Sequence, residues 1–149
     1  MKRPRTDYIV VHCADTYARM DIGLKEITHW HTDAPPKGNG WSTVGYHFII
    51  RRDGTREIGV PVDSAGIHVK GFNTCSVGVC LVGGKGDNGE AENNFTKAQF
   101  DALWEILEIL RMHYPNAEVV GHRDLNPDKP CPSFDAKSWY AAKLQEHDA

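Results

Sequence analysis

The stretch Tyr8-Ile9-Val10-Val11-His12 is a run of apolar, mostly β-branched residues that ends in an imidazole. Branched side chains pack well on a pleated sheet, so this run predicts a buried strand. Four more segments are predicted as strands, namely residues 45–52, 56–60, 76–82 and 118–120. The first two of these should pair as a hairpin, because the Asp53-Gly54 dipeptide between them is a strong turn signal.

Three segments are predicted as helices. Residues 21–33 place apolar side chains on one face. A second helix begins with a capping box of Thr96 and Gln99 and continues at helical spacing to about Pro115. A third should run from about residue 135 into the tail. The predicted architecture is α/β (mixed α+β), a single domain with a central mixed sheet of about five strands flanked by about three helices.

Length and composition are those of one ordinary globular domain. The chain has 149 residues, 40% hydrophobic and 25% charged, which is enough to build a core without disulfides. The formal net charge of −3 argues against direct nucleic-acid binding. Residues 1–6 are predicted to be a flexible basic arm, either solvated or a dock for an acidic partner. Residues 7–149 are predicted as the domain, and we expect a monomer.

The sequence indicates a cytoplasmic location at synthesis. Residues 1–12 contain no apolar stretch long enough for a signal peptide, and no segment reaches the length of a membrane span. The four cysteines should therefore be reduced. Cys75 and Cys80 are expected in the core, and Cys13 should face away from its neighbour His12.

The segment from Gly121 to Pro132 contains His122 and Cys131 on what should be a proline-stiffened loop. With His12 these give two imidazoles and one thiol, which suit zinc, and three protein ligands leave a fourth position for water. The sequence thus predicts a metallohydrolase. Two other interpretations stay open at this point: His12 as a hydrogen-bonded core histidine, and Cys131 as a buried thiol in a rigid loop.

Lys129 stands two residues before Cys131, and each of them precedes a proline. A residue before proline is restricted to extended conformations, so the two side chains should project to the same side. We therefore expect the lysine ammonium near whatever the thiol binds.

Other histidines are weaker ligand candidates. His29 and His31 should point apart on a helix, and His47 should face away from Tyr46 on a strand. His113 and His147 lie at a helix end and in the tail, where solvated or capping roles are common.

Several segments in one order carry a family resemblance: residues 10–13, 44–50, 67–73, 121–124 and 129–134. They resemble the zinc-dependent N-acetylmuramoyl-L-alanine amidases of the peptidoglycan-recognition superfamily. Within that superfamily the chain is most similar to the small phage lysozyme-type amidases, the endolysins. The resemblance extends from Tyr8 to about Tyr140.

The resemblance implies a zinc ion bound by His12, His122 and Cys131, with Tyr46 and Lys129 assisting catalysis. The implied reaction cuts the amide bond between N-acetylmuramic acid and L-alanine in peptidoglycan, and the implied role is lysis of a phage host after release to the wall. Lys129 is a candidate for stabilising the oxyanion. A phenol with a pKa of about 10 is a poor base at neutral pH, so Tyr46 could orient water instead.

Two further residues are expected to contact substrate. His68 lies in a segment with a glycine at each end, which the resemblance places at the rim of the active site. Trp41 follows a glycine-rich loop and could stack on a sugar or a peptide stem. A carboxylate such as Asp124 could orient a ligand imidazole.

Three alternative functions remain in view. Some members of the superfamily bind peptidoglycan without cutting it, but those lack the cysteine ligand that Cys131 would supply. The similar phage proteins can also bind and inhibit their own RNA polymerase, and residues 1–6 are the feature that invites such contact. A cysteine hydrolase would need a base near its thiol, and His12 should face away from Cys13.

Overall fold

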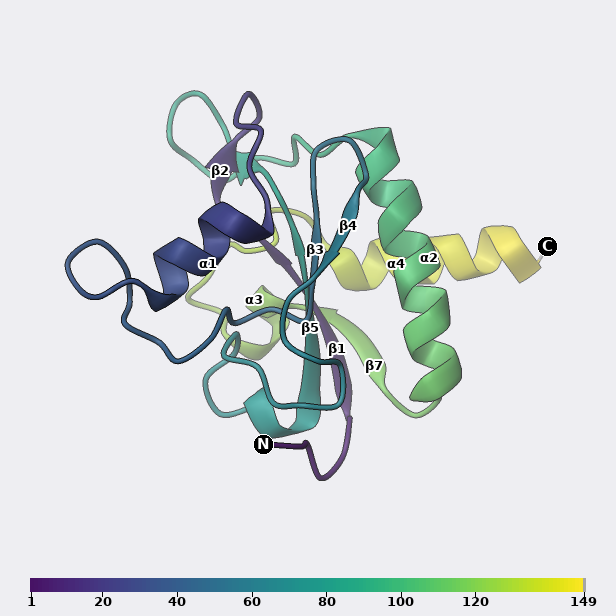
Figure 1. Cartoon of the computed structure of the whole chain (residues 1–149). Coiled ribbons are helices and arrows are strands. Elements are labelled where there is room, and N and C mark those ends of the chain that lie inside the picture. The colour runs from purple at the N-terminus through teal and green to yellow at the C-terminus, as the bar shows by residue number, and fades with distance from the viewer. Residues whose placement is uncertain (149) are drawn as a thin grey trace.

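The computed structural model describes residues 1–148, and residue 149, the last of the predicted domain, lies outside the described part. A five-stranded sheet in the order β4-β3-β5-β1-β7 forms the centre of the molecule (Figure 1). Its strands are β1 (Tyr8–Cys13), β3 (Phe48–Ile50), β4 (Arg56–Ile58), β5 (Ser76–Leu81) and β7 (Glu118–Gly121). Only β4 is antiparallel to its neighbour. The predicted α/β class and the mixed sheet of five strands are confirmed.

The predicted strand at residues 8–12 is β1, which pairs with β5 on one side and β7 on the other. Its side chains alternate between two buried faces, as strand geometry requires. Ile9 and Val11 belong to the large core cluster, whereas Val10 packs on the opposite face with Val69 and Val120. A strand buried on both faces explains why its sequence is almost continuously apolar.

One face of the sheet is covered by α2 (Lys97–His113) and α4 (Ala136–Asp148) (Figure 1). The predicted capping box is present, since Thr96 accepts from the Gln99 backbone at 3.1 Å and Gln99 accepts from the Thr96 backbone at 3.0 Å. The buried Gln99 amide also donates to the carbonyls of Ile50 and Val82. The capping residue therefore ties the start of α2 to the sheet.

The opposite face carries α1 (Leu24–Thr32) and the short α3 (His122–Leu125) (Figure 1). The helix predicted over residues 21–33 begins three residues late, at Leu24, because Glu26 accepts from the backbone N–H of the capping residue Gly23 and Glu57 accepts from that of Leu24. The expectation that His122 lies on a loop is wrong, since it is the first residue of α3.

The hairpin is present but shorter than predicted, with three residues in each strand. Gly59 and Val60 donate to the successive carbonyls of His47 and Tyr46, which is not the alternating pattern of an antiparallel ladder. A small second sheet joins β2 (Thr16–Tyr17) to β6 (Gly84–Lys85), and a single 3-10 turn spans Asn73–Cys75. Strands of two residues have no periodicity that a sequence could reveal.

Residues 1–6 contact the loop that precedes His68. The Arg3 guanidinium donates to the carbonyls of Val62 and Ser64, and the Lys2 backbone forms a bridge to Ser64. Whether these residues form an arm separate from the domain stays a prediction. Among residues 1–148, no helix combines the length and apolar character that crossing a bilayer would require.

Candidate metal centre and active site

The three predicted metal ligands lie together. His12 is near the carboxyl end of β1, and His122 directly follows β7, the parallel neighbour of β1. One donor atom each from His12, His122 and Cys131 lies within 4.8 Å of the others. His12 Nδ1 is 3.9 Å from Cys131 Sγ. Both imidazoles therefore lie close together at the carboxyl ends of two adjacent parallel strands.

Cys131 is held by hydrogen bonds on both sides of its loop. Its carbonyl accepts from the Arg123 backbone at 2.8 Å, and the Ser133 hydroxyl donates to the carbonyl of Gly84 at 2.9 Å. The Cys13 backbone N–H points at the Cys131 sulfur from 3.1 Å. A hydrogen bond with the Cys13 side chain, together with burial, raises the pKa of the Cys131 thiol well above its usual value. A metal that binds here must therefore displace the thiol proton.

The position of His122 depends on the junction between β7 and α3. Asp124 accepts from the Gly121 backbone N–H at 2.7 Å and so caps the helix that begins with His122. A side chain at Gly121 would meet Pro132 Cδ at 2.9 Å, which is tighter than packing allows. Asp124 therefore orients His122 through the backbone. Burial, followed by the charge of Lys129, lowers the pKa of the His122 imidazole.

His12 is surrounded by other imidazoles. Its ring centre lies 4.6 Å from that of His122 and 4.9 Å from that of His68. Burial, followed by these neighbours, lowers the pKa of His12 well below its usual value. A neutral imidazole is the form that binds a metal, so the interior keeps His12 ready to act as a ligand.

Tyr46 lies beside the predicted ligand His12, with its ring centre 5.1 Å from that of His12. Burial raises the pKa of its phenol well above the usual value, so the hydroxyl keeps its proton at neutral pH. On the other side, the Tyr46 ring lies 5.4 Å from that of His31. This surrounding favours Tyr46 as a hydrogen-bond donor over Tyr46 as a base.

Sequence reasoning missed His31, which it treated only as a poor metal ligand. His31 Nδ1 accepts from the Gly45 backbone at 2.9 Å, and its ring lies 4.7 Å from that of Trp41. His31 therefore joins α1 to the segment that bears Tyr46. The contact links residues 14 positions apart, and no local sequence pattern predicts it.

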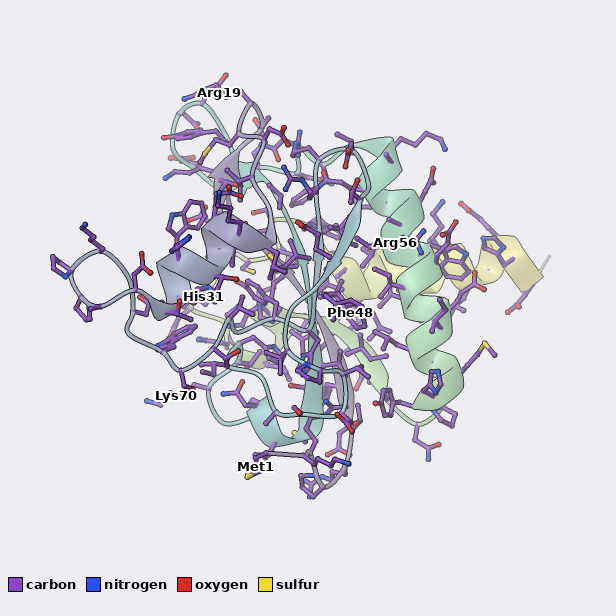
Figure 2. All side chains as sticks on the ribbon, viewed as in Figure 1. Met1, Arg19, His31, Phe48, Arg56 and Lys70 are labelled. Atoms are coloured by element: carbon purple, nitrogen blue, oxygen red, sulfur yellow. The ribbon has the colours of Figure 1, made fainter. Side chains whose placement is uncertain are left out.

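Two pockets meet at His122 and Lys129. The first, of about 250 Å³, is lined by Tyr46, His122, Lys129 and Cys131 among others. The second, of about 440 Å³, is lined by Trp41, His68, Lys70, His122 and Lys129 among others. Figure 2 shows Lys70 at the outer edge of the molecule, pointing outward. Six of the seven site residues predicted from the sequence therefore line these two pockets, and the seventh, the buried His12, lies beside His68 and His122.

Three other histidines lie elsewhere. His29 pairs with Asp33 at 3.1 Å, His147 stacks on Trp104, and His113 lies beside Tyr114. His47 is buried on the sheet, where it accepts from Gly78 N–H and donates to the Ser64 carbonyl.

We expect His47 to make the stability of the fold dependent on pH. Burial, with a smaller contribution from the charge of Arg3, lowers the pKa of His47 from 6.5 to about 4. Between these values the unfolded chain binds a proton that the folded chain does not, so the free energy of unfolding falls as pH falls. The difference corresponds to about 3 kcal/mol once pH is below 4. Urea titrations at pH 7, 5.5 and 4 should show this loss.

A His47→Gln protein is the matched control for that series, because its side chain does not titrate. It should be less stable than the natural protein at pH 7 and should lose less stability on acidification. Parallel losses in the two proteins would show that His47 does not contribute.

Two His donors thus lie at the carboxyl ends of adjacent parallel strands, and a Cys donor on the loop after α3 completes the cluster. The sequence profile of the N-acetylmuramoyl-L-alanine amidases matches residues 2–134, and the chain belongs to that family.

Individual relatives agree with this assignment. The endolysin of Klebsiella phage KP32 is 52% identical over 139 residues, which are 93% of this chain and 88% of the relative. The endolysin of Escherichia phage T7 is 46% identical over 139 residues, with the same coverage of 93% and 88%. The solved structure of the Ph2119 endolysin from a Thermus scotoductus bacteriophage superposes with a TM-score of 0.77 at 28% identity, covering 96% of this chain and 88% of that one.

Proposed function

We propose that the chain is a zinc-dependent hydrolase that cuts the amide bond between N-acetylmuramic acid and L-alanine in bacterial peptidoglycan. The observation that carries the proposal is the convergence of His12, His122 and Cys131 donor atoms within 4.8 Å, where two pockets meet. Host lysis at the end of a phage infection is the proposed biological role, by analogy with the endolysins of KP32 and T7.

The donor set fits zinc. Bond lengths of about 2.0–2.1 Å to nitrogen and 2.3 Å to sulfur place tetrahedral ligand atoms about 3.6 Å apart. The distance of 3.9 Å between His12 Nδ1 and Cys131 Sγ is close to this value. When bound, zinc supplies a Lewis acid that acidifies water and polarises the scissile carbonyl.

The remaining work falls to side chains of this protein. Lys129 lines both pockets, so its ammonium is available to the oxygen that gains charge as the amide is attacked. Tyr46 keeps its proton and can donate a hydrogen bond that orients the attacking water or the substrate carbonyl. Trp41 lies at the far wall of the larger pocket, where it can pack against the stem peptide or a sugar.

Replacing Tyr46 with Phe tests the role of the phenol. The substitution keeps the ring that packs beside His12 and removes only the hydroxyl. We expect kcat to fall about 10- to 100-fold with zinc content unchanged, because one oriented donor is lost. Steady-state kinetics with metal analysis measures this, and unaltered kcat would leave Tyr46 as a packing residue.

The central experiment combines metal analysis with mass spectrometry of digested peptidoglycan. We expect one zinc per chain, release of stem peptides with a free L-alanine amine, loss of activity on chelation and recovery with zinc. Zinc-loaded protein that binds the wall and releases no peptide would establish the non-catalytic alternative. Activity that resists chelators and is lost with iodoacetamide would establish a thiol hydrolase.

Binding of the cognate phage RNA polymerase is a separate proposal, which rests on the family resemblance and on the exposed side chains of Lys2 and Arg5. Arg3 contacts the domain, so Lys2 and Arg5 are the residues to change. A pull-down should retain the polymerase with the natural protein and lose it with the Lys2→Ala, Arg5→Ala double variant. Failure of the natural protein to retain polymerase rejects the proposal.

A further inference from the structure

Both ring nitrogens of His68 contact polar groups inside the protein. His68 Nδ1 lies 2.8 Å from His12 Nε2, and His68 Nε2 lies 3.2 Å from Ser76 Oγ. Ser76 Oγ in turn lies 2.7 Å from the carbonyl oxygen of Phe72. The exposed fractions of His12, Ser76 and His68 are 1%, 0% and 9%. A continuous chain of contacts thus runs from a backbone carbonyl to a predicted metal ligand.

The Phe72 carbonyl at the end of this series of contacts sets the donor and the acceptor of every hydrogen bond in it. A backbone carbonyl only accepts hydrogen bonds, so the single hydroxyl proton of Ser76 goes to Phe72. The Ser76 oxygen then accepts from His68, which places the proton of the neutral His68 ring on Nε2. His68 Nδ1 is left as an acceptor, and His12 Nε2 must donate to it.

The consequence reaches the metal site. With its proton on Nε2, the neutral His12 ring has its lone pair on Nδ1, the nitrogen that lies 3.9 Å from the Cys131 sulfur. We propose that the Phe72 carbonyl, Ser76 and His68 form a one-way hydrogen-bond relay that selects the metal-binding tautomer of His12. This inference rests on the proposed function, because it takes His12 to be a zinc ligand. It makes Ser76 and His68 positioning residues.

The surroundings of His68 are shaped to hold its ring in this place. Gly78 on β5 lies under the imidazole, and a Cβ at that position would meet His68 Nδ1 at 2.7 Å and Cγ at 2.8 Å. Asn73 Oδ1 accepts from the backbone N–H groups of His68 and Val69, each at 2.9 Å. The strand beneath and the loop behind therefore fix the ring against His12.

The relay also limits what His68 can do for a substrate. Both nitrogens are already used, so the part of the ring that faces the 440 Å³ pocket can offer only carbon atoms. The expectation of substrate contact by His68 thus reduces to van der Waals packing, while its polar role is directed at His12.

A matched pair of substitutions at His68 tests the relay. Asn and Leu have nearly the same shape, but the Asn Oδ1 atom can accept from His12 at the place of Nδ1, and Leu cannot. We expect His68→Leu to weaken zinc binding about 10- to 100-fold, measured by competition with a chromogenic chelator. Ser76→Ala leaves the acceptor on residue 68 in place and should weaken zinc binding only about 2-fold, because an equal mixture of tautomers halves the fraction of His12 that can bind. His68→Asn should stay within about 3-fold of the natural protein. His47→Gln, a change at a buried histidine outside the relay, should lower stability without altering zinc affinity.

A second readout detects the tautomer itself. Long-range ¹H–¹⁵N NMR of the natural protein should show the His12 proton on Nε2, both with zinc and after its removal, and Ser76→Ala should give a mixture of tautomers. A His12 proton on Nδ1 in the natural protein overturns the relay, as does full zinc affinity in His68→Leu. If the natural protein binds no zinc, the proposed function fails, and the tautomer of His12 still decides the relay. If His68→Leu does not fold, Ser76→Ala and the NMR spectrum of the natural protein decide it.

Discussion

A Cys131→Ser protein should have no measurable amidase activity and should bind zinc more than about 100-fold more weakly than the natural protein. This loss is larger than the loss of about 10- to 100-fold expected when only a residue that orients a ligand is removed. The substitution replaces a thiolate by a hydroxyl that stays protonated and is a poor zinc ligand. The hydrogen bonds that hold the loop, from Arg123 and Ser133, involve backbone and serine atoms and survive the change. Chelator competition and peptide release from purified walls measure the two effects.

Cys75→Ser is the matched control for this experiment. Cys75 is a buried cysteine, and its thiol donates to the Phe72 carbonyl at 3.5 Å, a contact that serine can reproduce. We expect the control to keep its zinc and its activity. Normal turnover by Cys131→Ser would contradict the ligand assignment and with it the proposed chemistry.

Removing the ammonium of Lys129 gives the second large effect. Lys129→Ala should lower kcat about 10²- to 10³-fold, the usual cost of losing one group that stabilises a developing oxyanion. Zinc should stay bound, because Lys129 supplies no ligand atom. The side chain is exposed, so the stability of the fold should change little.

Lys97→Ala provides the comparison, since Lys97 is an exposed lysine on α2 whose ion pair with Asp101 lies away from both pockets. It should behave as the natural protein does in every assay. If Lys129→Ala loses its zinc together with its activity, Lys129 holds the Cys131 loop in place and does not act on the substrate.

The sequence predicted the sheet well, because its strands and helices have strong local patterns. The apolar run at residues 8–12 and the capping box at Thr96 both specify one structure from a few neighbouring residues. The start of α1 depends in part on Glu57, which lies 33 positions along the chain and accepts from the Leu24 N–H. Such boundaries follow from tertiary contacts that local patterns do not encode.

The same difference between local patterns and long-range contacts explains which site residues could be predicted. His122, Lys129 and Cys131 lie within ten positions of one another, and their prolines indicate a defined loop. The contacts of His68 with His12 and Ser76 join three segments, which are held together by packing on Gly78 and by the hydrogen bonds of Asn73. His31 was missed for the same reason, because its partner Gly45 is on another element.

His12 and Cys131 stand 119 positions apart, so one bound ion would close the long segment between them into a ring. An ion that binds only the folded form adds about 4 kcal/mol of stability at a thousand times its dissociation constant. A chain still emerging from the ribosome has no third donor until Cys131 has been made. A product that ends before Cys131 would therefore lack one of the three donors and, under the proposed function, would not cleave the wall.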